Sequence, residues 1–480
     1  MAVYAALVGG HFHPVAAGAD PAGYLLSARL LSEGQLTTEM RVLPGFPPAE
    51  AWEYTPLGAV HSERLGALVP TYPVGLPLAY AVSARVFGWH WGPVLIGTLF
   101  ACGAVAATYL ASRESGAGRA MAAAAAVALA VCPLLLHASF QPLSDPAAAC
   151  TTALAVAFAL RARRQQDWIG SVAAGAALAG AVLLRPTNLL ALPAIALALG
   201  RPRLLAGALL GGLPGAVFLG WYQHTLYGGV METGYGPIWA LFDVAHVAPA
   251  LHKYGVWLPA FLPVGALALV LAPWLPWRSR AREVAVLLLW FFAFAGFYAF
   301  YRHTHEIRWF LRFLLPGLPA LLALAALAAD SLCGRLAASR RRFARRTAAV
   351  IAILVSLGTG IHHWRAEDLG GVGRKLEMFR DAAIWTDAHL PPDAVILTLY
   401  ASGSFYVYTE RTVLRADVIK ARRFADLTAL AAENRWPVYA LLAREADEPG
   451  LAERLPGTWS EVRRFGEAGE LGLWTLDTPR

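Results

Sequence analysis

The chain has 480 residues, of which 57% are apolar or aromatic and only 15% carry a formal charge. Soluble domains average roughly 45–50% apolar and about 25% charged residues, so this composition indicates a membrane protein. The net charge of +8 comes from arginines that lie between apolar runs, not interleaved with aromatic residues on one soluble face, which argues against nucleic-acid binding.

The chain starts with MAVYAALVGG, about half of the ~20 apolar residues that a membrane-spanning helix needs. Either Met1 is not the true start and the first helix is incomplete, or the chain inserts in an unusual way, and we expect the first. An external loop over residues 10–90 follows. Residues 71–88 are apolar enough to span, but a span there would place the later arginine clusters outside, so we predict an interfacial helix on the outer leaflet, with Tyr72 at headgroup level.

Short connectors with clustered arginines separate the remaining apolar runs, and the positive-inside rule places these connectors in the cytoplasm. The pattern predicts a mainly α, polytopic bundle of about 10–11 transmembrane helices, counting the incomplete first one. After that first helix, the predicted spans are 92–112, 119–136, 146–161, 168–184, 187–200, 203–222, 255–273, 283–301, 309–330 and 347–364. The transmembrane domain would therefore cover residues 1–363.

Residues 364–480 have a different pattern and are predicted to form a small external α/β domain. Two helices are expected, at 376–390 and 425–434. Strands are expected at 394–400, 404–408, 412–416, 438–443, 459–465 and 471–476. This domain carries no motif with an obvious catalytic role.

Ionisable residues near a bilayer are costly and tend to be functional, so those on the predicted external side are candidate site residues. Asp20 opens the stretch GADPAGYLLSARLLSEG, in which Tyr24, Ala28 and Leu31 share one face of a predicted helix that Gly34 ends. Asp20 is therefore either a functional acid or a helix N-cap.

Two further external positions carry charge. Asp145, in QPLSDPAAAC, precedes a proline at the outer start of a span, where capping could be its sole role. Arg185, in LLRPTNLL, opposes the positive-inside trend. Its position requires either an anionic partner or snorkelling to the interface.

The segment YRHTHEIRWFLRF, residues 301–313, also lies outside by this topology. Its arginines, Arg302, Arg308 and Arg312, suit the oxygens of a lipid phosphate, because a guanidinium binds phosphate bidentately and stays charged in a low dielectric. The alternative is an ion pair of Glu306 with Arg302 or Arg308, which we expect to account for only one of the three arginines.

His303 and His305 in the same segment are candidate metal ligands, with His61 elsewhere in the external loop. The His-x-His spacing lacks a second ligand pair, so the sequence does not require a divalent metal or any other cofactor.

Taken in order, these motifs resemble those of the GT-C membrane glycosyltransferases, in the protein-mannosyltransferase-like and aminoarabinose-transferase-like branch. The resemblance covers nearly the whole chain and rests on loose motifs in matching order and sidedness. The motifs are Asp20, Tyr24, Ala28 and Gly34, the helix TYPVGLPLAYAVSARVFG, PLSDP, LLRPTN and RWFLRFLLPGLPAL.

The resemblance implies a multi-pass enzyme of a bacterial-type cytoplasmic (inner) membrane that moves a sugar from a polyprenyl-phosphate donor to an acceptor at the outer face, with inversion. Asp20 would be the general base, while Arg308, Arg312 and Arg185 would hold the departing phosphate. Asp145, Tyr24, Arg302 and Glu306 would belong to the same substrate site. Many members of this family carry a second acid directly after the first, where this chain has Pro21.

Two other classes stay open. A transporter or flippase of lipid-linked sugars would also need external arginines, but such proteins usually have broken or charged spans, and the spans here read as nearly clean. A non-catalytic membrane scaffold is the third class. The sequence names neither the sugar nor the acceptor, which could be a glycan, a lipid or a protein.

Overall fold

The computed structural model describes residues 1–236, 238–444 and 455–477. The chain forms two compact units. The first, here called the helical unit, comprises Met1–Phe12, Leu95–Trp221 and Pro237–Gly370. The second, the mixed unit, comprises His13–Val94, Tyr222–Gly236 and Gly371–Arg480. The predicted boundary at residue 363 separates a transmembrane domain from an external one, and it stays a prediction. The compact units divide the chain differently, because the mixed unit contains both the first loop and the C-terminal tail.

Each predicted span of the helical unit coincides with a helix or with a pair of consecutive helices. One of them, α7 (Trp168–Leu184), has the predicted bounds. The others are α1 (Ala2–His11), α3 (Gly75–Glu114), α4 (Arg119–Ala130), α5 (Pro133–Ser139), α6 (Asp145–Gln165), α8 (Leu192–Leu199), α9 (Pro202–Tyr227), α10 (Val247–Phe261), α11 (Pro263–Val270), α12 (Ala281–Ala299), α13 (Leu318–Gly334) and α14 (Ala338–Ala366).

Several of these spans are broken, so the expectation of nearly clean spans was wrong. The α4–α5 pair bends by 54°, and the 3-10 helix η7 (Arg308–Leu314) meets α13 at 77°. Proline begins α5, α11 and η2 (Pro186–Ala191), where its missing N–H costs no hydrogen bond. Among the described residues, four helices are long and apolar enough to cross a membrane, or six with each bent pair counted once. The protein is thus polytopic, and the total of about 10–11 spans stays a prediction.

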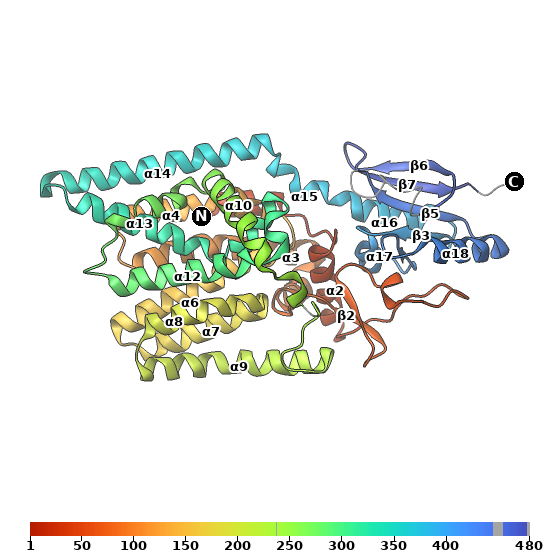
Figure 1. Ribbon diagram of the computed structural model, residues 1–480, viewed down its shortest axis with the longest axis horizontal. Helices are drawn as coiled ribbons and strands as arrows, with labels where there is room; N and C mark the ends of the chain where they lie inside the picture. Colours follow the sequence, from red (N-terminus) through yellow and green to blue (C-terminus); the bar gives the residue numbers. More distant parts are fainter. Residues whose placement is uncertain (237, 445–454, 478–480) are drawn as a thin grey trace. The chain divides into compact units, whose positions relative to one another are not determined.

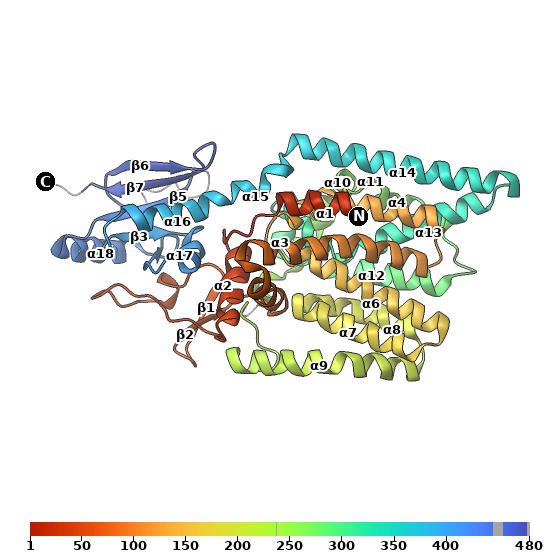
Figure 2. The same cartoon turned by 180° about the vertical axis from the view of Figure 1, so that it is seen from behind.

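The helices of this unit run side by side, with α6 packed against α7 and α8 and α4 packed against α13 and α14 (Figures 1 and 2). Small residues permit the closest approaches. A Cβ on Gly175 of α7 would lie 1.9 Å from the carbonyl oxygen of Ala208 in α9, and one on Gly211 of α9 would lie 2.0 Å from that of Val172. Such contacts let helix backbones touch where lipid offers no hydrophobic drive for association.

The mixed unit contains a five-stranded sheet in the order β4-β3-β5-β7-β6 (Figure 1). The strands β3 (Val395–Thr398), β4 (Leu414–Arg415) and β5 (Val438–Ala443) are parallel. The other two, β7 (Leu471–Leu476) and β6 (Trp459–Phe465), continue the sheet antiparallel. The longer helices of the C-terminal tail, which accompany this sheet, are α16 (Glu377–His389), α17 (Ser402–Tyr408) and α18 (Ala421–Asn434).

This α/β arrangement confirms every predicted element of the tail except one. Residues 404–408 were expected to be a strand, and they lie in the helix α17 instead. The alternation in SFYVY is compatible with a strand, but β3 and β4 are parallel, and a parallel pair needs a crossover connection, usually a helix.

The predicted separation of residues 71–88 from the span 92–112 is confirmed. Helix α3 is interrupted at Gly88, whose φ of 76° is left-handed. The hydroxyl of Ser83 donates to the carbonyl of Gly92 at 3.0 Å, which closes the bend. Before the bend Leu78, Val82 and Val86 form an exposed apolar stripe. This stripe suits an outer-leaflet position, which stays a prediction.

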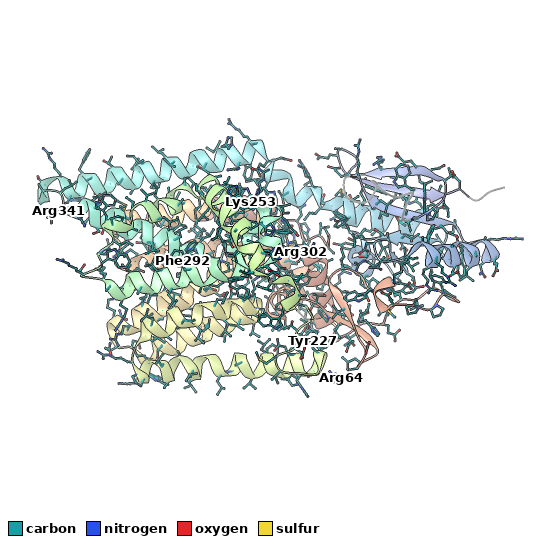
Figure 3. The ribbon with its side chains drawn as sticks, in the orientation of Figure 1. Arg64, Tyr227, Lys253, Phe292, Arg302 and Arg341 are labelled. Atoms are coloured by element: carbon teal, nitrogen blue, oxygen red, sulfur yellow. The ribbon has the colours of Figure 1, made fainter. Side chains whose placement is uncertain are left out.

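A short hairpin of β1 (Ala59–Ser62) and β2 (Ala67–Pro70) joins the end of α9 within the same unit. The hydroxyl of Tyr227 donates to the carbonyl of Pro70 at 2.7 Å, and the guanidinium of Arg64 donates to the carbonyls of His224 and Thr225 (Figure 3). The hairpin is thereby tied to the last turn of α9.

Candidate active site

Asp20 is the first residue of α2 (Asp20–Ser32), with Pro21 in the first turn. The predicted helix of the first loop is confirmed, and Gly34, which has a φ of 76°, follows its end. Tyr24 lies one turn after Asp20 and is buried. The N-cap position of α2 is Ala19 and no side chain caps the helix, so the N-cap alternative for Asp20 was wrong, although a carboxylate in the first turn is favoured by the helix dipole.

One partner of Asp20 is Tyr72, which was expected at headgroup level. Tyr72 is instead buried, and its side chain forms a hydrogen bond with the Asp20 carboxylate. Burial, followed by the nearby charge of Asp20, raises the pKa of the Tyr72 hydroxyl well above its usual value, so the hydroxyl is the donor. The Tyr72 ring packs on Tyr24 at 5.0 Å and on Tyr235 at 5.8 Å.

A glycine contact holds α2 against the chain that precedes β1. Gly58 has a φ of 93°, and a Cβ there would lie 2.4 Å from the Cα of Gly23. Only glycine combines this backbone conformation with so close an approach. The position of Asp20 thus depends on two glycines that no motif had singled out.

The C-terminal α/β tail also holds the two stretches of chain beside Asp20, residues 16–20 and 57–58, which are here called the Asp20 loop. Just beyond the carboxyl end of β3, the carbonyl of Tyr400 accepts from the backbone N–H of Gly18 at 3.2 Å. The hydroxyl of Ser402 accepts from Leu57 N–H at 3.0 Å. The hydroxyl of Tyr408 accepts from Ala16 N–H at 2.9 Å. The Asp20 loop therefore occupies the edge at which open parallel sheets usually bind their ligands.

In the helical unit, Asp145 is fully buried between two arginines. Its Oδ1 accepts from Arg185 at 2.5 Å and its Oδ2 accepts from Arg312 at 2.7 Å. Both guanidiniums also lie over the Phe313 ring, at 5.4 and 5.2 Å from its centre. The anionic partner that Arg185 requires is thus Asp145, whose side chain makes no capping hydrogen bond to α6.

Helix breaks bring these three residues together. Asp145 begins α6 after the bent α4–α5 pair, and Arg185 follows the last residue of α7. Arg312 lies in the 3-10 helix η7, not one turn inside a regular span. Irregular backbone is tolerated at membrane depth only where protein or water satisfies its polar groups. Arg312 is itself buried, as this rule requires.

The other two arginines of the segment 301–313 also have carboxylate partners. Arg302 lies 3.6 Å from Glu306, and Arg308 lies 3.1 Å from Glu367, at the end of α14. The expectation that internal pairing could account for only one arginine was therefore wrong. Arg302 is exposed (Figure 3) and Arg308 is half exposed, so these pairs differ from the buried Asp145 pair.

The two histidines of this segment have separate surroundings. His303 forms a hydrogen bond with Glu306, with 2.7 Å between His303 Nδ1 and Glu306 Oε2. His305 packs on His246, with ring centres 5.2 Å apart, and burial together with His246 lowers its pKa. Within the described ranges, no group of three or more histidine, cysteine, aspartate or glutamate residues could hold a metal ion.

No protein-family model matches the sequence, and no curated protein matches it. Solved structures do match. ArnT from Cupriavidus metallidurans, bound to undecaprenyl phosphate, aligns with 99% of this chain and 96% of its own at 17% identity and a TM-score of 0.60.

Two other structures are also similar. The oligosaccharyltransferase AglB from Archaeoglobus fulgidus, in complex with an inhibitory peptide and a dolichol-phosphate, aligns with 98% of this chain and 73% of its own at 12% identity and a TM-score of 0.56. The arabinofuranosyltransferase AftD from Mycobacteria aligns with 95% of this chain and 41% of its own at 14% identity and a TM-score of 0.50.

All three are membrane glycosyltransferases of the GT-C superfamily. The similarity runs through both compact units, since it covers nearly the whole chain. The chain therefore has the GT-C fold.

Proposed function

We propose that the protein is a GT-C glycosyltransferase that uses a polyprenyl-phosphate-linked sugar as its donor. The GT-C fold supports this proposal, as does the binding of undecaprenyl phosphate by ArnT and of a dolichol-phosphate by AglB. The reaction would take place at the outer face of a bacterial-type cytoplasmic membrane.

The observation that carries the proposal is the group of Asp145, Arg185 and Arg312. Asp145 holds one nitrogen of each guanidinium, so both side chains are oriented before any ligand binds. One carboxylate between two guanidiniums leaves this group with a net positive charge, which suits a phosphate. Preoriented donors in a buried site stabilise charge that develops on a leaving phosphate, at little cost in reorganisation.

Asp20 would be the general base of the reaction. Its carboxylate takes the proton of an acceptor hydroxyl while that oxygen attacks the anomeric carbon of the donor sugar. The bond between this carbon and the phosphate oxygen breaks, so the configuration inverts and polyprenyl phosphate departs. General-base catalysis typically contributes about 10² to 10⁴ in rate.

The remaining candidate residues would have supporting roles. Tyr72 would orient the Asp20 carboxylate, and Tyr24 would pack behind Tyr72. Arg308, held by Glu367, would contact the phosphate from the more exposed side. The more distant pair of Arg302 and Glu306 would lie at the entrance. No step requires a metal, although AglB has also been solved with Zn.

The test is sugar transfer from a labelled polyprenyl-phosphate donor by the full chain in lipid vesicles. Asp20→Asn and Arg312→Ala should each lower the rate by at least about 10²-fold. Two matched controls, Asp426→Asn on the exposed face of α18 and Arg340→Ala on α14, should transfer at the wild-type rate. Full transfer by Asp20→Asn would remove the base assignment.

The same experiment separates the other classes. The broken spans remove the argument that clean spans disfavour a flippase, because discontinuous helices are common in transporters. A flippase would move the labelled lipid across the vesicle without changing it. A scaffold would do neither, so the chemical form of the label identifies an enzyme, and its side of the vesicle membrane separates a flippase from a scaffold.

A further inference from the structure

A cavity of about 940 Å³ lies in the mixed unit, and Asp20 is not among the residues that line it. Its lining combines two aromatic rings with charged groups of both signs: Arg29, Asp387, Asp393, Tyr408, Arg411 and Trp436. The volume lies within the roughly 300–1,000 Å³ that ligand pockets usually have.

The cavity opens at the amino ends of the parallel strands. Asp393 lies just before β3 and Trp436 just before β5. The carboxyl end of β3 leads to the residues that hold the Asp20 loop. The α/β tail thus holds the proposed catalytic loop and also presents this cavity, and Tyr408 takes part in both, because its hydroxyl accepts from Ala16 N–H and it lines the cavity.

The base of the cavity is rigid. The guanidinium of Arg411 donates to Asp387 Oδ1 at 2.9 Å and to the carbonyls of Asp387, Leu390 and Pro391 at 2.9, 2.6 and 2.6 Å. Arg29 donates to the carbonyl of Val407 and lies 5.6 Å from the Tyr408 ring. These contacts hold side chains of the lining in place, which lowers the entropic cost of ordering them when a ligand binds.

We propose that this cavity binds a glycan, as the part of the acceptor that lies beyond its reacting sugar. Sugar hydroxyls both donate and accept hydrogen bonds, and the lining includes the carboxylate of Asp393 and the hydroxyl of Thr412, which can pair with them. The rings of Trp436 and Tyr408 provide apolar faces for the sugar ring. Three carboxylates, including that of Glu410, disfavour an anionic ligand, and so much charge disfavours a lipid tail.

The link to the proposed reaction is α2 itself. Asp20 begins this helix, and Arg29 lines the cavity nine residues later. A helix rises ~1.5 Å per residue, so the two positions are about 14 Å apart along it. An acceptor that reaches both must extend over more than one sugar. The acceptor role therefore rests on the proposed function, whereas glycan binding can be tested without it.

The binding test uses the full-length protein in detergent on an array of bacterial envelope oligosaccharides, with unglycosylated peptides on the same slide. Wild type should bind one structurally related group of glycans. Trp436→Ala should weaken that binding at least tenfold. The matched control Trp52→Ala, an exposed tryptophan outside the cavity, should bind as wild type does. Asp20→Asn should also bind normally, because this site would not depend on catalysis.

A second measurement uses an array-positive oligosaccharide as acceptor. Trp436→Ala should raise its KM at least fivefold while leaving donor hydrolysis unchanged. Absence of glycan binding by wild type, binding to the peptides alone, or equal binding by wild type and Trp436→Ala would each overturn the glycan site. Glycan binding without sugar transfer would refute the proposed enzyme and leave the glycan site intact.

Discussion

The hydroxyl of Tyr72 donates a hydrogen bond to the carboxylate of Asp20. The two residues are far apart in the first external loop, and the contact gives the proposed base a defined orientation. An acid at a helix N-terminus is common, but one oriented by a buried tyrosine has a more specific environment.

The first prediction concerns Tyr72→Phe. Loss of one hydrogen bond of about 1 kcal/mol should lower the transfer rate roughly fivefold, with no change in donor KM. The raised pKa of Tyr72 keeps its hydroxyl protonated well above pH 10, so this group should not titrate between pH 6 and 9. Wild type and Tyr72→Phe should therefore have pH–rate profiles of the same shape over this range. A rise or fall of the rate between pH 6 and 9 that occurs in wild type but not in Tyr72→Phe would show that the Tyr72 hydroxyl does titrate in this range.

The second prediction concerns Asp145→Asn. Removing the charge of this buried carboxylate leaves two guanidiniums without the group that holds them, which should destabilise the protein by roughly 3–5 kcal/mol. Thermal unfolding in detergent should show a lowered Tm. Glu306→Gln, which breaks the solvent-exposed pair with Arg302, is the control and should cost at most about 1 kcal/mol. Similar shifts for both variants would contradict the structural role of Asp145.

The third prediction compares two glycines with positive φ. Gly58→Ala should displace α2, because its Cβ would meet Gly23, and should lower both Tm and the transfer rate. Gly66→Ala has similar backbone strain, with a φ of 60°, but no atom within 4 Å of the added Cβ. It should cost about 1 kcal/mol and leave transfer unchanged. Equal effects on transfer would mean that the Gly58–Gly23 approach does not position Asp20.

The fourth prediction tests whether the α/β tail holds the Asp20 loop. Ser402→Ala removes the hydroxyl that accepts a hydrogen bond from the Leu57 N–H. Losing this hydrogen bond should destabilise the local structure by roughly 1–3 kcal/mol. Hydrogen exchange should become faster in the segment around Leu57, together with a lower transfer rate. Ser460→Ala, at an exposed position on β6, is the matched control and should leave both unchanged. Unaltered exchange around Leu57 in Ser402→Ala would show that the tail does not order the loop.

The sequence determined where the helices lie, because crossing a bilayer requires apolar runs of defined length and arginine marks their cytoplasmic ends. The bounds of α7 are correct to the residue, and most elements of the tail are also correct. The same signal cannot report the bends at α5 and η7, since apolar composition is equal in straight and broken helices. These bends depend on neighbours that satisfy the freed backbone groups. Similarly, SFYVY has the alternation of a strand, and only the parallel pairing of β3 with β4 makes it a helix.

For the site, the sequence supplied the residues, because ionisable groups stand out in an apolar chain. The tertiary structure decided their partners. Asp145 lies 40 residues from Arg185 and 167 from Arg312, and no local pattern encodes a pair at such separations. Tyr72 carried the signal of an interfacial aromatic residue and instead orients Asp20. A buried charge is stable only with a partner, and which partner it finds depends on the packing of the whole unit.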